Sequence, residues 1–348
     1  MKQTLALKTD QLWFNGAREV EVRTQDLAAP KAGELLVKTF YSAISAGTEM
    51  LVYRGQLPAE MKLDATVEAM QQQSGYPLQY GYACVGQVID TGMDVDASWL
   101  GKRVFAFQPH GSYFCVAAEH VIPVPDDIDA QAAVFLANME TAVNLVQDGK
   151  PAIGEHVVIL GQGIVGLLLS SLLAEYPLAQ LYALDTYSQR RTCALLQGVD
   201  QVCNPGSFME VSALKQQLTR QQNFQGADLI YEVSGIPETL NLAIELSGYN
   251  SRIVIGSWYG NKSAIVALGG EAHRNRLDIS TSQVSTIAPE HSGRWDKSRR
   301  FDLCWDMIRK VCPQQLITHR SKLEDAGTLY KQLDQSPETI IQAVFVYS

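Results

Sequence analysis

Three glycines at fixed spacing constrain what this chain can fold into more than any other feature of its sequence. They read Gly161-x-Gly163-x-x-Gly166, after the apolar run Val157–Leu160, which predicts a buried strand, and before Ile164–Leu173, which predicts a helix. In such a unit the first glycine allows a tight turn, the second lets the backbone approach a pyrophosphate, and the third lets helix and strand pack closely. The stretch therefore predicts a phosphate-binding turn at the positive end of a helix.

A carboxylate further along extends this prediction to a dinucleotide. Asp185 ends the next apolar run about 20 residues beyond the glycines, where it can accept hydrogen bonds from an adenosine ribose, which favours NAD over NADP. Two other interpretations stay open. Residues 157–174 carry no charge and can be a membrane span, although glycines interrupt the run, or the fold can bind no cofactor. The candidate cofactor-binding residues here are Gly161, Gly163, Ile164, Val165, Gly166 and Asp185.

Length and charge limit the architecture and the partners. A chain of 348 residues exceeds what one core usually supports, so two domains are expected. A formal net charge of -9 argues against nucleic acid or an anionic membrane as the main partner and leaves a small-molecule substrate. The N-terminus lacks the apolar core of a signal peptide, which predicts a cytoplasmic protein. The six cysteines are scattered, without a CxxC pair.

The first part of the chain, to about residue 125, predicts a β-rich domain. Alternating apolar and polar residues predict strands at 34–43, 86–92 and 102–108. Residues 57–73 are polar and helix-compatible, which predicts a surface insertion.

The middle part predicts an α/β domain with a doubly wound parallel sheet, because strands and helices alternate there. A helix over 130–146 leads into the strand before the glycines, and a helix around 299–311 follows the alternating region. The intervening elements are expected as strands at 180–185, 227–233 and 252–256 and helices at 189–197 and 237–246.

The ordered landmarks of the chain resemble the medium-chain dehydrogenase/reductase family over nearly its whole length. Besides the glycine turn, they are Ser45–Gly55, Gly75–Gly92, Leu100–Phe107, Met139–Ala142, Gly226–Gly235 and Leu316–Ala326. The resemblance implies a GroES-like catalytic domain formed by residues 1–138 and 287–348, and a Rossmann NAD-binding domain at 139–286. It also implies hydride transfer with a nicotinamide, and a homodimer joined through Rossmann sheet edges.

The chain departs from the zinc enzymes of that family at each catalytic ligand position. Their Cys-Gly-Ser/Thr-Asp motif reads Ala46-Gly47-Thr48-Glu49 here, their Gly-His-Glu motif reads Gly81-Tyr82-Ala83, and the third ligand position falls near Ala137. A catalytic zinc site needs three protein donors, so no zinc is expected. The motifs GTE, GYPL, GY and VG resemble a zinc-independent branch that includes hydroxyethyl (bacterio)chlorophyllide dehydrogenase, which oxidises a secondary alcohol to a ketone.

Without a metal, side chains must stabilise the reacting oxygen and move its proton. The resemblance assigns this chemistry to Tyr82, at a lost ligand position, to Thr48 beside the substrate and to Glu49 behind the metal site. His273 and His110 are further candidate bases, because histidine titrates near neutral pH. For each the structural alternative stays open: Tyr82 fills the space of the metal, Glu49 pairs with an arginine, and Thr48 caps a turn.

Four further residues are matched to the cofactor by the resemblance. Thr141 corresponds to a threonine at the nicotinamide face, Ser282 and Gln283 lie near the carboxamide, and Arg190 corresponds to an arginine that can stack on adenine. The sequence thus predicts a zinc-independent NAD(P)-dependent oxidoreductase acting on a secondary alcohol or ketone. The alternatives are an NADPH-dependent quinone or enoyl reductase, which Asp185 disfavours, and a non-catalytic NAD-binding sensor.

Overall fold

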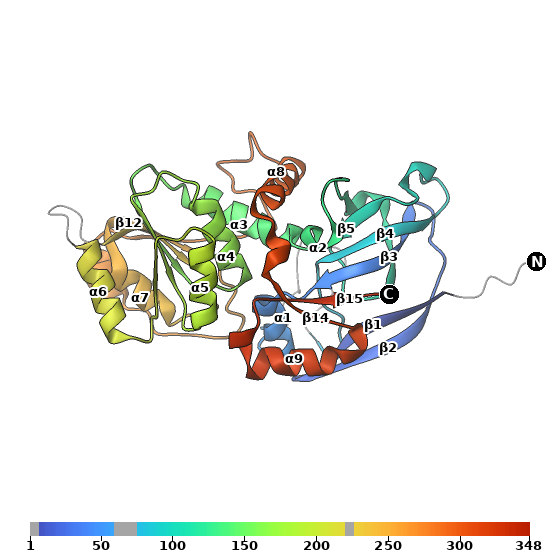
Figure 1. Ribbon diagram of the computed structural model, residues 1–348, viewed down its shortest axis with the longest axis horizontal. Coiled ribbons are helices and arrows are strands. Elements are labelled where there is room, and N and C mark those ends of the chain that lie inside the picture. Colours follow the sequence, from blue (N-terminus) through green and yellow to red (C-terminus); the bar gives the residue numbers. More distant parts are fainter. Residues whose placement is uncertain (1–6, 59–74, 220–225) are drawn as a thin grey trace, which may run out of the picture. The chain divides into compact units, whose positions relative to one another are not determined.

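Two compact units make up the chain in the computed structural model, which describes residues 7–58, 75–219 and 226–348 (Figure 1). The first unit comprises Met1–Ala137 and Ile308–Ser348, and the second comprises Asn138–Met307. The chain enters the second unit within helix α3 (Leu136–Gly149) and leaves it within helix α8 (Lys297–Val311). The sequence places this return at residue 287. It lies later because α8 is bound to α3 through the Arg300–Glu140 ion pair.

The first unit is the predicted β-rich domain. Its seven-stranded sheet has the order β14-β15-β3-β4-β5-β7, with β6 also paired to β3, and β1 and β2 form a separate hairpin. The last strand pairs antiparallel with β3, so both chain ends build one sheet. Its strands are β1 (Leu7–Gly16), β2 (Glu19–Leu27), β3 (Glu34–Ala43), β4 (Cys84–Thr91), β5 (Arg103–Ala106), β6 (Tyr113–Ala117), β7 (Val121–Pro123), β14 (Ile317–Ser321) and β15 (Gln342–Val346). Its helices are α1 (Ala46–Tyr53), α2 (Ala130–Ala133) and α9 (Ala326–Gln335).

Helix α9 packs one apolar face into the core of this unit. Its buried residues are Ala326, Leu329, Tyr330 and Leu333, at the i, i+3, i+4, i+7 spacing of a helix face. The Tyr330 ring meets Phe14 of β1 edge-on, with 5.3 Å between the ring centroids. Burying each such side chain contributes roughly 1.5–3 kcal/mol, so this face anchors α9 to the hairpin.

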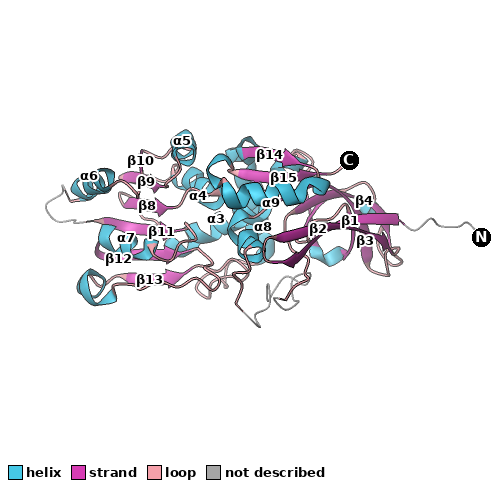
Figure 2. Ribbon diagram, turned by 90° about the horizontal axis from the view of Figure 1, so that it is seen from below, coloured by secondary structure: helices cyan, strands magenta, loops and turns pink. Residues whose placement is uncertain are grey.

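The second unit is the predicted doubly wound parallel sheet. Its six strands follow the order β10-β9-β8-β11-β12-β13, as Figure 2 shows. Numbered from β8, this is the order 3-2-1-4-5-6, which reverses between β8 and β11 and so marks the expected ligand crevice. The strands are β8 (His156–Leu160), β9 (Gln180–Leu184), β10 (Gln201–Cys203), β11 (Ala227–Glu232), β12 (Ser247–Ile255) and β13 (Asp278–Thr281). The helices besides α3 and α8 are α4 (Ile164–Leu173), α5 (Ser188–Leu196), α6 (Phe208–Leu218) and α7 (Thr239–Leu246).

The predicted fold class is therefore confirmed, with corrections to single elements. The helix predicted over 130–146 is wrong, because α2 ends at Ala133 and α3 begins at Leu136. Strands β10 and β13 and helix α6 were not predicted. The insertion predicted at 57–73 lies, from residue 59 on, outside the described residues. Across the described ranges, no helix has both the length and the apolar character needed to cross a bilayer.

Candidate functional site

The turn between β8 and α4 is shaped by its glycines in three different ways. Gly161 has a φ of +99°, which favours glycine, and a Cβ there would lie 2.6 Å from the Cα of Ser234. A Cβ on Gly166 would lie 2.1 Å from the carbonyl oxygen of Gly161, so only glycine lets α4 pack this closely. Gly163 is different, because no described atom lies within 4 Å of a Cβ built there. The backbone is thus open to a ligand at the N-terminus of α4, where Ile164 and Val165 begin the helix.

Asp185 directly follows β9 and joins its end to the glycine turn. Its Oδ2 accepts a hydrogen bond from the backbone N–H of Gln162 and its Oδ1 one from Tyr187, both at 2.8 Å. An ionised carboxylate can accept about four hydrogen bonds, so capacity remains for a ribose. Nearby, Nη1 of Arg190 lies 3.8 Å from Asp185 Oδ2, and its guanidinium stacks over the Tyr187 ring. Helix N-terminus, open glycine and carboxylate together fit a dinucleotide.

The residues matched to the nicotinamide end lie on α3 and just after β13. Ser282 follows the last residue of β13, and its Oγ accepts a 2.8 Å hydrogen bond from Nδ2 of Asn144 on α3. Gln283 is exposed; its Nε2 donates to Oγ of Ser285 at 3.1 Å, and its Oε1 accepts from the Ser285 backbone N–H at 2.6 Å. Thr141 is partly buried on α3, one residue after Glu140. Because the sheet is parallel, Ser282, Asp185 and the glycine turn share its carboxyl edge.

His273 is not brought to that edge. It precedes β13, whose strand direction matches that of β12, and therefore lies at the amino edge of the sheet. Its side chain is exposed. The predicted catalytic role of His273 is therefore corrected, since the parallel strands separate it from the glycine turn by the height of the sheet.

In the first unit, three hydroxyl groups gather where α1 begins. The Tyr82 hydroxyl donates a hydrogen bond to Oγ of Ser45, the residue that precedes α1, and lies 3.3 Å from Oγ1 of Thr48. Tyr82 and Thr48 are both partly exposed. The predicted pair Tyr82 and Thr48 is thus together, and Ser45, which sequence reasoning missed, completes the hydroxyl cluster. Its position immediately before a helix was the available signal.

Glu49 is buried behind this hydroxyl cluster, and both of its carboxylate oxygens have hydrogen-bond partners. Its Oε1 accepts a 2.7 Å hydrogen bond from the Ser45 backbone N–H, and its Oε2 lies 3.0 Å from Nε2 of His110 and accepts from the Tyr330 hydroxyl. Burial, and next the Glu49 charge, raise the pKa of Tyr330 well above its ordinary value, so this phenol stays a donor. On the far side of the ring, His110 Nδ1 lies 2.7 Å from Oγ of Ser42.

This arrangement corrects the expected catalytic role of Glu49. With an exposed fraction of 0%, its carboxylate cannot reach a substrate, and its partners are a histidine and a tyrosine instead of the arginine considered above. Glu49 therefore acts on the hydroxyl cluster only indirectly, by holding the backbone of Ser45. His110, the second candidate base, is equally buried in this network.

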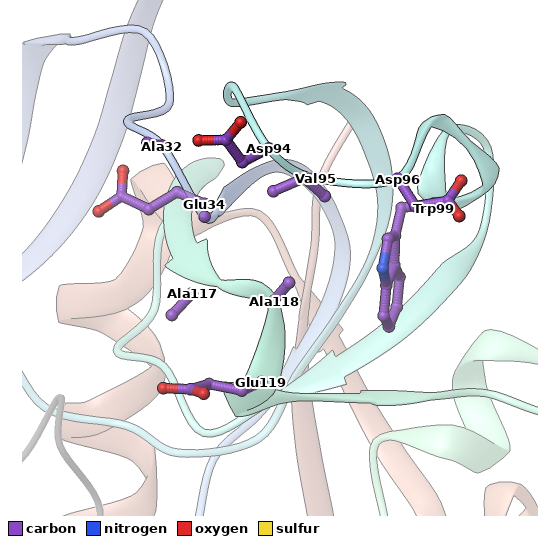
Figure 3. A pocket seen from close by; sticks show the side chains of 10 residues that line it. Ala32, Glu34, Asp94, Val95, Asp96, Trp99, Ala117, Ala118 and Glu119 are labelled. Atoms are coloured by element: carbon purple, nitrogen blue, oxygen red, sulfur yellow. The ribbon is translucent and has the colours of Figure 1, made fainter.

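A separate cavity of about 540 Å³ lies at the other end of β3 in the first unit (Figure 3). Glu34, Asp94, Asp96 and Glu119 are among the residues that line it, together with Trp99. Glu34 begins the ten-residue strand β3, whereas the hydroxyl cluster follows its end, roughly 30 Å away. Glu34 and Asp96 also already bond the backbone of their own loops. This cavity is therefore not part of the candidate site.

Across residues 7–58, 75–219 and 226–348, no three His, Cys, Asp or Glu side chains form a group that could hold a metal ion.

The chain is similar in sequence and in fold to known proteins. No protein-family model matches the chain. D-guloside 3-dehydrogenase of Escherichia coli K12 is 24% identical over 326 residues, covering 89% of this chain and 92% of the relative. The 2-desacetyl-2-hydroxyethyl bacteriochlorophyllide A dehydrogenase of Cereibacter sphaeroides is 24% identical over 353 residues, covering 96% and 97%.

A solved structure of an E. coli CFT073 alcohol dehydrogenase with NADH superimposes with a TM-score of 0.78 at 18% identity. The match covers 98% of this chain and 99% of that one. The named relatives are dehydrogenases, and the chain shares the fold of the medium-chain alcohol dehydrogenases, a GroES-like domain with a Rossmann domain.

Proposed function

We propose that this chain is an NAD(H)-dependent oxidoreductase that interconverts a secondary alcohol and a ketone without a zinc ion. The observation that carries the proposal is the β8–α4 turn, which is open at Gly163 before a ten-residue helix and is bonded to the carboxylate of Asp185. A helix N-terminus beside a ribose-binding carboxylate suits a dinucleotide. The dehydrogenase names of the relatives support the reaction class.

Each half of the cofactor has its own residues in this proposal. The glycine turn holds the pyrophosphate, Asp185 holds the adenosine ribose and Arg190 lies against the adenine. Thr141, Ser282 and Gln283 bind the nicotinamide half. When bound, the nicotinamide supplies the hydride acceptor or donor that the reaction requires.

In this proposal the hydroxyl cluster transfers the proton of the substrate hydroxyl group. In ketone reduction, Oη of Tyr82 donates its proton to the oxygen that gains negative charge, and the phenolate, which the Ser45 hydroxyl stabilises, takes up a proton from solvent because Tyr82 is partly exposed. In alcohol oxidation the same proton moves in reverse, from the substrate hydroxyl through Tyr82 to solvent. Thr48, 3.3 Å from Tyr82, offers a second hydroxyl to the same oxygen.

Zinc independence is proposed from the side chains at the ligand positions. Ala46 and Ala137 have no donor atom, and Tyr82 replaces the remaining ligand.

A second candidate function is supported at the ribose end. Arg190 lies near Asp185, and Nη1 of Arg191 donates to the carbonyl oxygens of Asp185 at 2.8 Å and Thr186 at 2.9 Å. Two guanidinium groups there can attract the extra phosphate of NADP, which would suit an NADPH-dependent quinone or enoyl reductase. The Asp185 carboxylate opposes that phosphate, so NAD remains our first choice.

The test uses the purified full chain. Its metal content is measured, NADH and NADPH are titrated by fluorescence, and turnover is assayed over secondary alcohols, polyols, ketones and enones with and without a chelator. We expect tighter NADH than NADPH binding and alcohol or ketone turnover that the chelator does not change. Stoichiometric zinc needed for activity would overturn the metal-free mechanism, enone reduction with NADPH would favour the second function, and NADH binding without any turnover would favour a sensor.

A homodimer and a cytoplasmic location remain parts of the proposal. β13 is the outer strand of its sheet, and all four of its residues are exposed. An exposed strand edge can pair with a second copy. Light scattering of the wild type and of an Ile279→Pro variant tests this dimer. The N–H of residue 279 lies on the free edge, because residues of alternate parity in β13 bond β12, as Ser282 does through Ile255.

A further inference from the structure

Arg300 of α8 is fully buried, and each of its guanidinium N–H groups has an acceptor. Nε and Nη2 donate to Oε1 of Glu140 at 3.0 and 2.8 Å. Nη1 donates to Oδ1 of Asn144 at 2.5 Å and to the carbonyl of Thr286 at 3.3 Å, and Nη2 also donates to the carbonyl of Val284. One side chain therefore ties α3 to the segment that follows β13.

Asn144 extends this Arg300 network to the end of β13. Its Nδ2 donates to Oγ of Ser282 at 2.8 Å and to Oδ2 of Asp148 at 2.9 Å. Glu140, Asn144 and Asp148 are spaced four residues apart and so share one face of α3. Sequence reasoning missed this polar stripe on α3, although its spacing was visible.

The Arg300 network contributes little to the free energy of folding for the number of polar groups that it buries. A buried ion pair is often no better than well-packed apolar residues of similar volume, whereas losing one partner leaves an unpaired charge. What Arg300 adds is a defined backbone, because it satisfies the carbonyls of Val284 and Thr286 in a segment outside regular structure. Its effect is thus concentrated on residues 282–286.

The position of this segment relates it to one half of a dinucleotide. The strand order reverses between β8 and β11, and a dinucleotide lies across that point. The glycine turn and Asp185 follow β8 and β9 on one side, and Ser282 follows β13 on the other. Helix α3 lies on the side of the strand reversal that carries β12 and β13. Its Leu145 side chain would lie 2.7 Å from a Cβ on Gly256, which directly follows β12.

We infer that Arg300 is a positioning residue for the nicotinamide half of the cofactor. It acts through Asn144 and the carbonyls of Val284 and Thr286, and it fixes residues 282–286 in the conformation that receives the nicotinamide. The adenosine half is held on the other side of the strand reversal and does not depend on it. This inference rests on the proposed function and adds residues to the same site.

The experiment compares two ligands that differ in the nicotinamide, NADH and ADP-ribose, by calorimetric titration. For Arg300→Met we expect the Kd for NADH to rise at least about fivefold, the equivalent of one lost hydrogen bond, while the Kd for ADP-ribose stays within about twofold. Hydrogen exchange of the ligand-free protein should show faster exchange at 282–286. Asn144→Ala keeps the Arg300–Glu140 pair and serves as the milder variant, with a smaller change in the same direction.

Arg252→Met is the matched control, because Arg252 forms an ion pair with Glu155 at the amino edge of the same sheet. It should leave both dissociation constants unchanged. Equal weakening of both ligands by Arg300→Met and Asn144→Ala would show a merely structural role and overturn the inference, as would unchanged NADH binding or unchanged exchange at 282–286. If the wild type binds neither ligand, the proposed function itself fails.

Discussion

Replacing Gly163 by alanine should separate cofactor binding from folding. Gly163 has φ −67° and ψ −175°, which any residue adopts, and no described atom lies within 4 Å of the new Cβ. Loss of glycine entropy in the unfolded chain stabilises by about 0.4–1 kcal/mol. Alanine is a poorer helix N-cap than glycine by about 0.5–1 kcal/mol. The two effects nearly cancel, so the free energy of unfolding should change by less than about 0.5 kcal/mol.

Binding should respond very differently. The added methyl stands where the pyrophosphate must approach the helix N-terminus and separates it from the backbone N–H groups. Losing one hydrogen bond to a charged group costs about 1.5–3 kcal/mol, which corresponds to a roughly 10- to 100-fold higher Kd for NADH. Urea denaturation midpoints and NADH titration of the same preparations measure both effects.

Gly166→Ala is the contrasting variant. Its Cβ would lie 2.1 Å from the backbone oxygen of Gly161, so α4 must move away from β8. Overpacking of this kind costs about 1–3 kcal/mol or more, and the better helix propensity of alanine offsets about 1 kcal/mol of it. We expect a lower urea midpoint for Gly166→Ala alone. Wild-type NADH affinity in Gly163→Ala would refute the assignment of this turn to a phosphate.

Three further predictions concern the first unit. Tyr82→Phe should lower kcat about 10²- to 10⁴-fold with unchanged NADH affinity, and steady-state kinetics that retain kcat within twofold would show that the ring only fills space. His110→Ala should destabilise the chain by about 1.5–3 kcal/mol because it removes a hydrogen-bond partner of the buried Glu49 carboxylate, whereas Ser42→Ala should cost about 1 kcal/mol; equal urea midpoints for the two would contradict this reasoning. Burial alone would raise the pKa of Asp334, but hydrogen bonds from Arg54 at 2.6 Å and Arg18 at 2.9 Å outweigh it and lower the pKa. The stability that Asp334 contributes is therefore present above the unfolded-state pKa of about 3.9 and is lost as pH falls through the lower folded value. Asp334→Asn should cost about 1 kcal/mol at neutral pH and progressively less toward acid, and a pH-independent difference in urea midpoint would exclude the ion pairs as its cause.

Elements that follow from a local sequence pattern, such as the glycine spacing or an apolar run, were predicted correctly. Helix α4 begins and ends at the predicted residues, because the glycine turn defines its start and an unbroken apolar run defines its length. The helix predicted over 130–146 fails at Val134 and Phe135. These two residues form the turn between α2 and α3. Every residue from 132 to 140 is buried, on both sides of the turn as well as in it, so the apolar pattern gave no signal of the break.

Other elements and contacts depend on distant partners. β13 has four exposed residues and no alternation, and only pairing with β12 makes it a strand. In the candidate site, the glycine turn and Asp185 could be predicted from their spacing along the sequence. Tyr82 and Thr48 could be predicted from the resemblance to a family motif. The contact between Arg300 and Glu140 joins residues 160 positions apart, which no local rule encodes.

The buried network around Glu49 forms one continuous row of hydrogen-bonded groups. With an ionised carboxylate, which only accepts, and a neutral ring, Nε2 of His110 carries the ring proton and Nδ1 offers a lone pair to the hydroxyl of Ser42. Ser42 then accepts from the hydroxyl of Tyr347, 2.8 Å away. One negative charge thereby orients a row of dipoles through the interior, and an amide at residue 49 would allow the row to point either way.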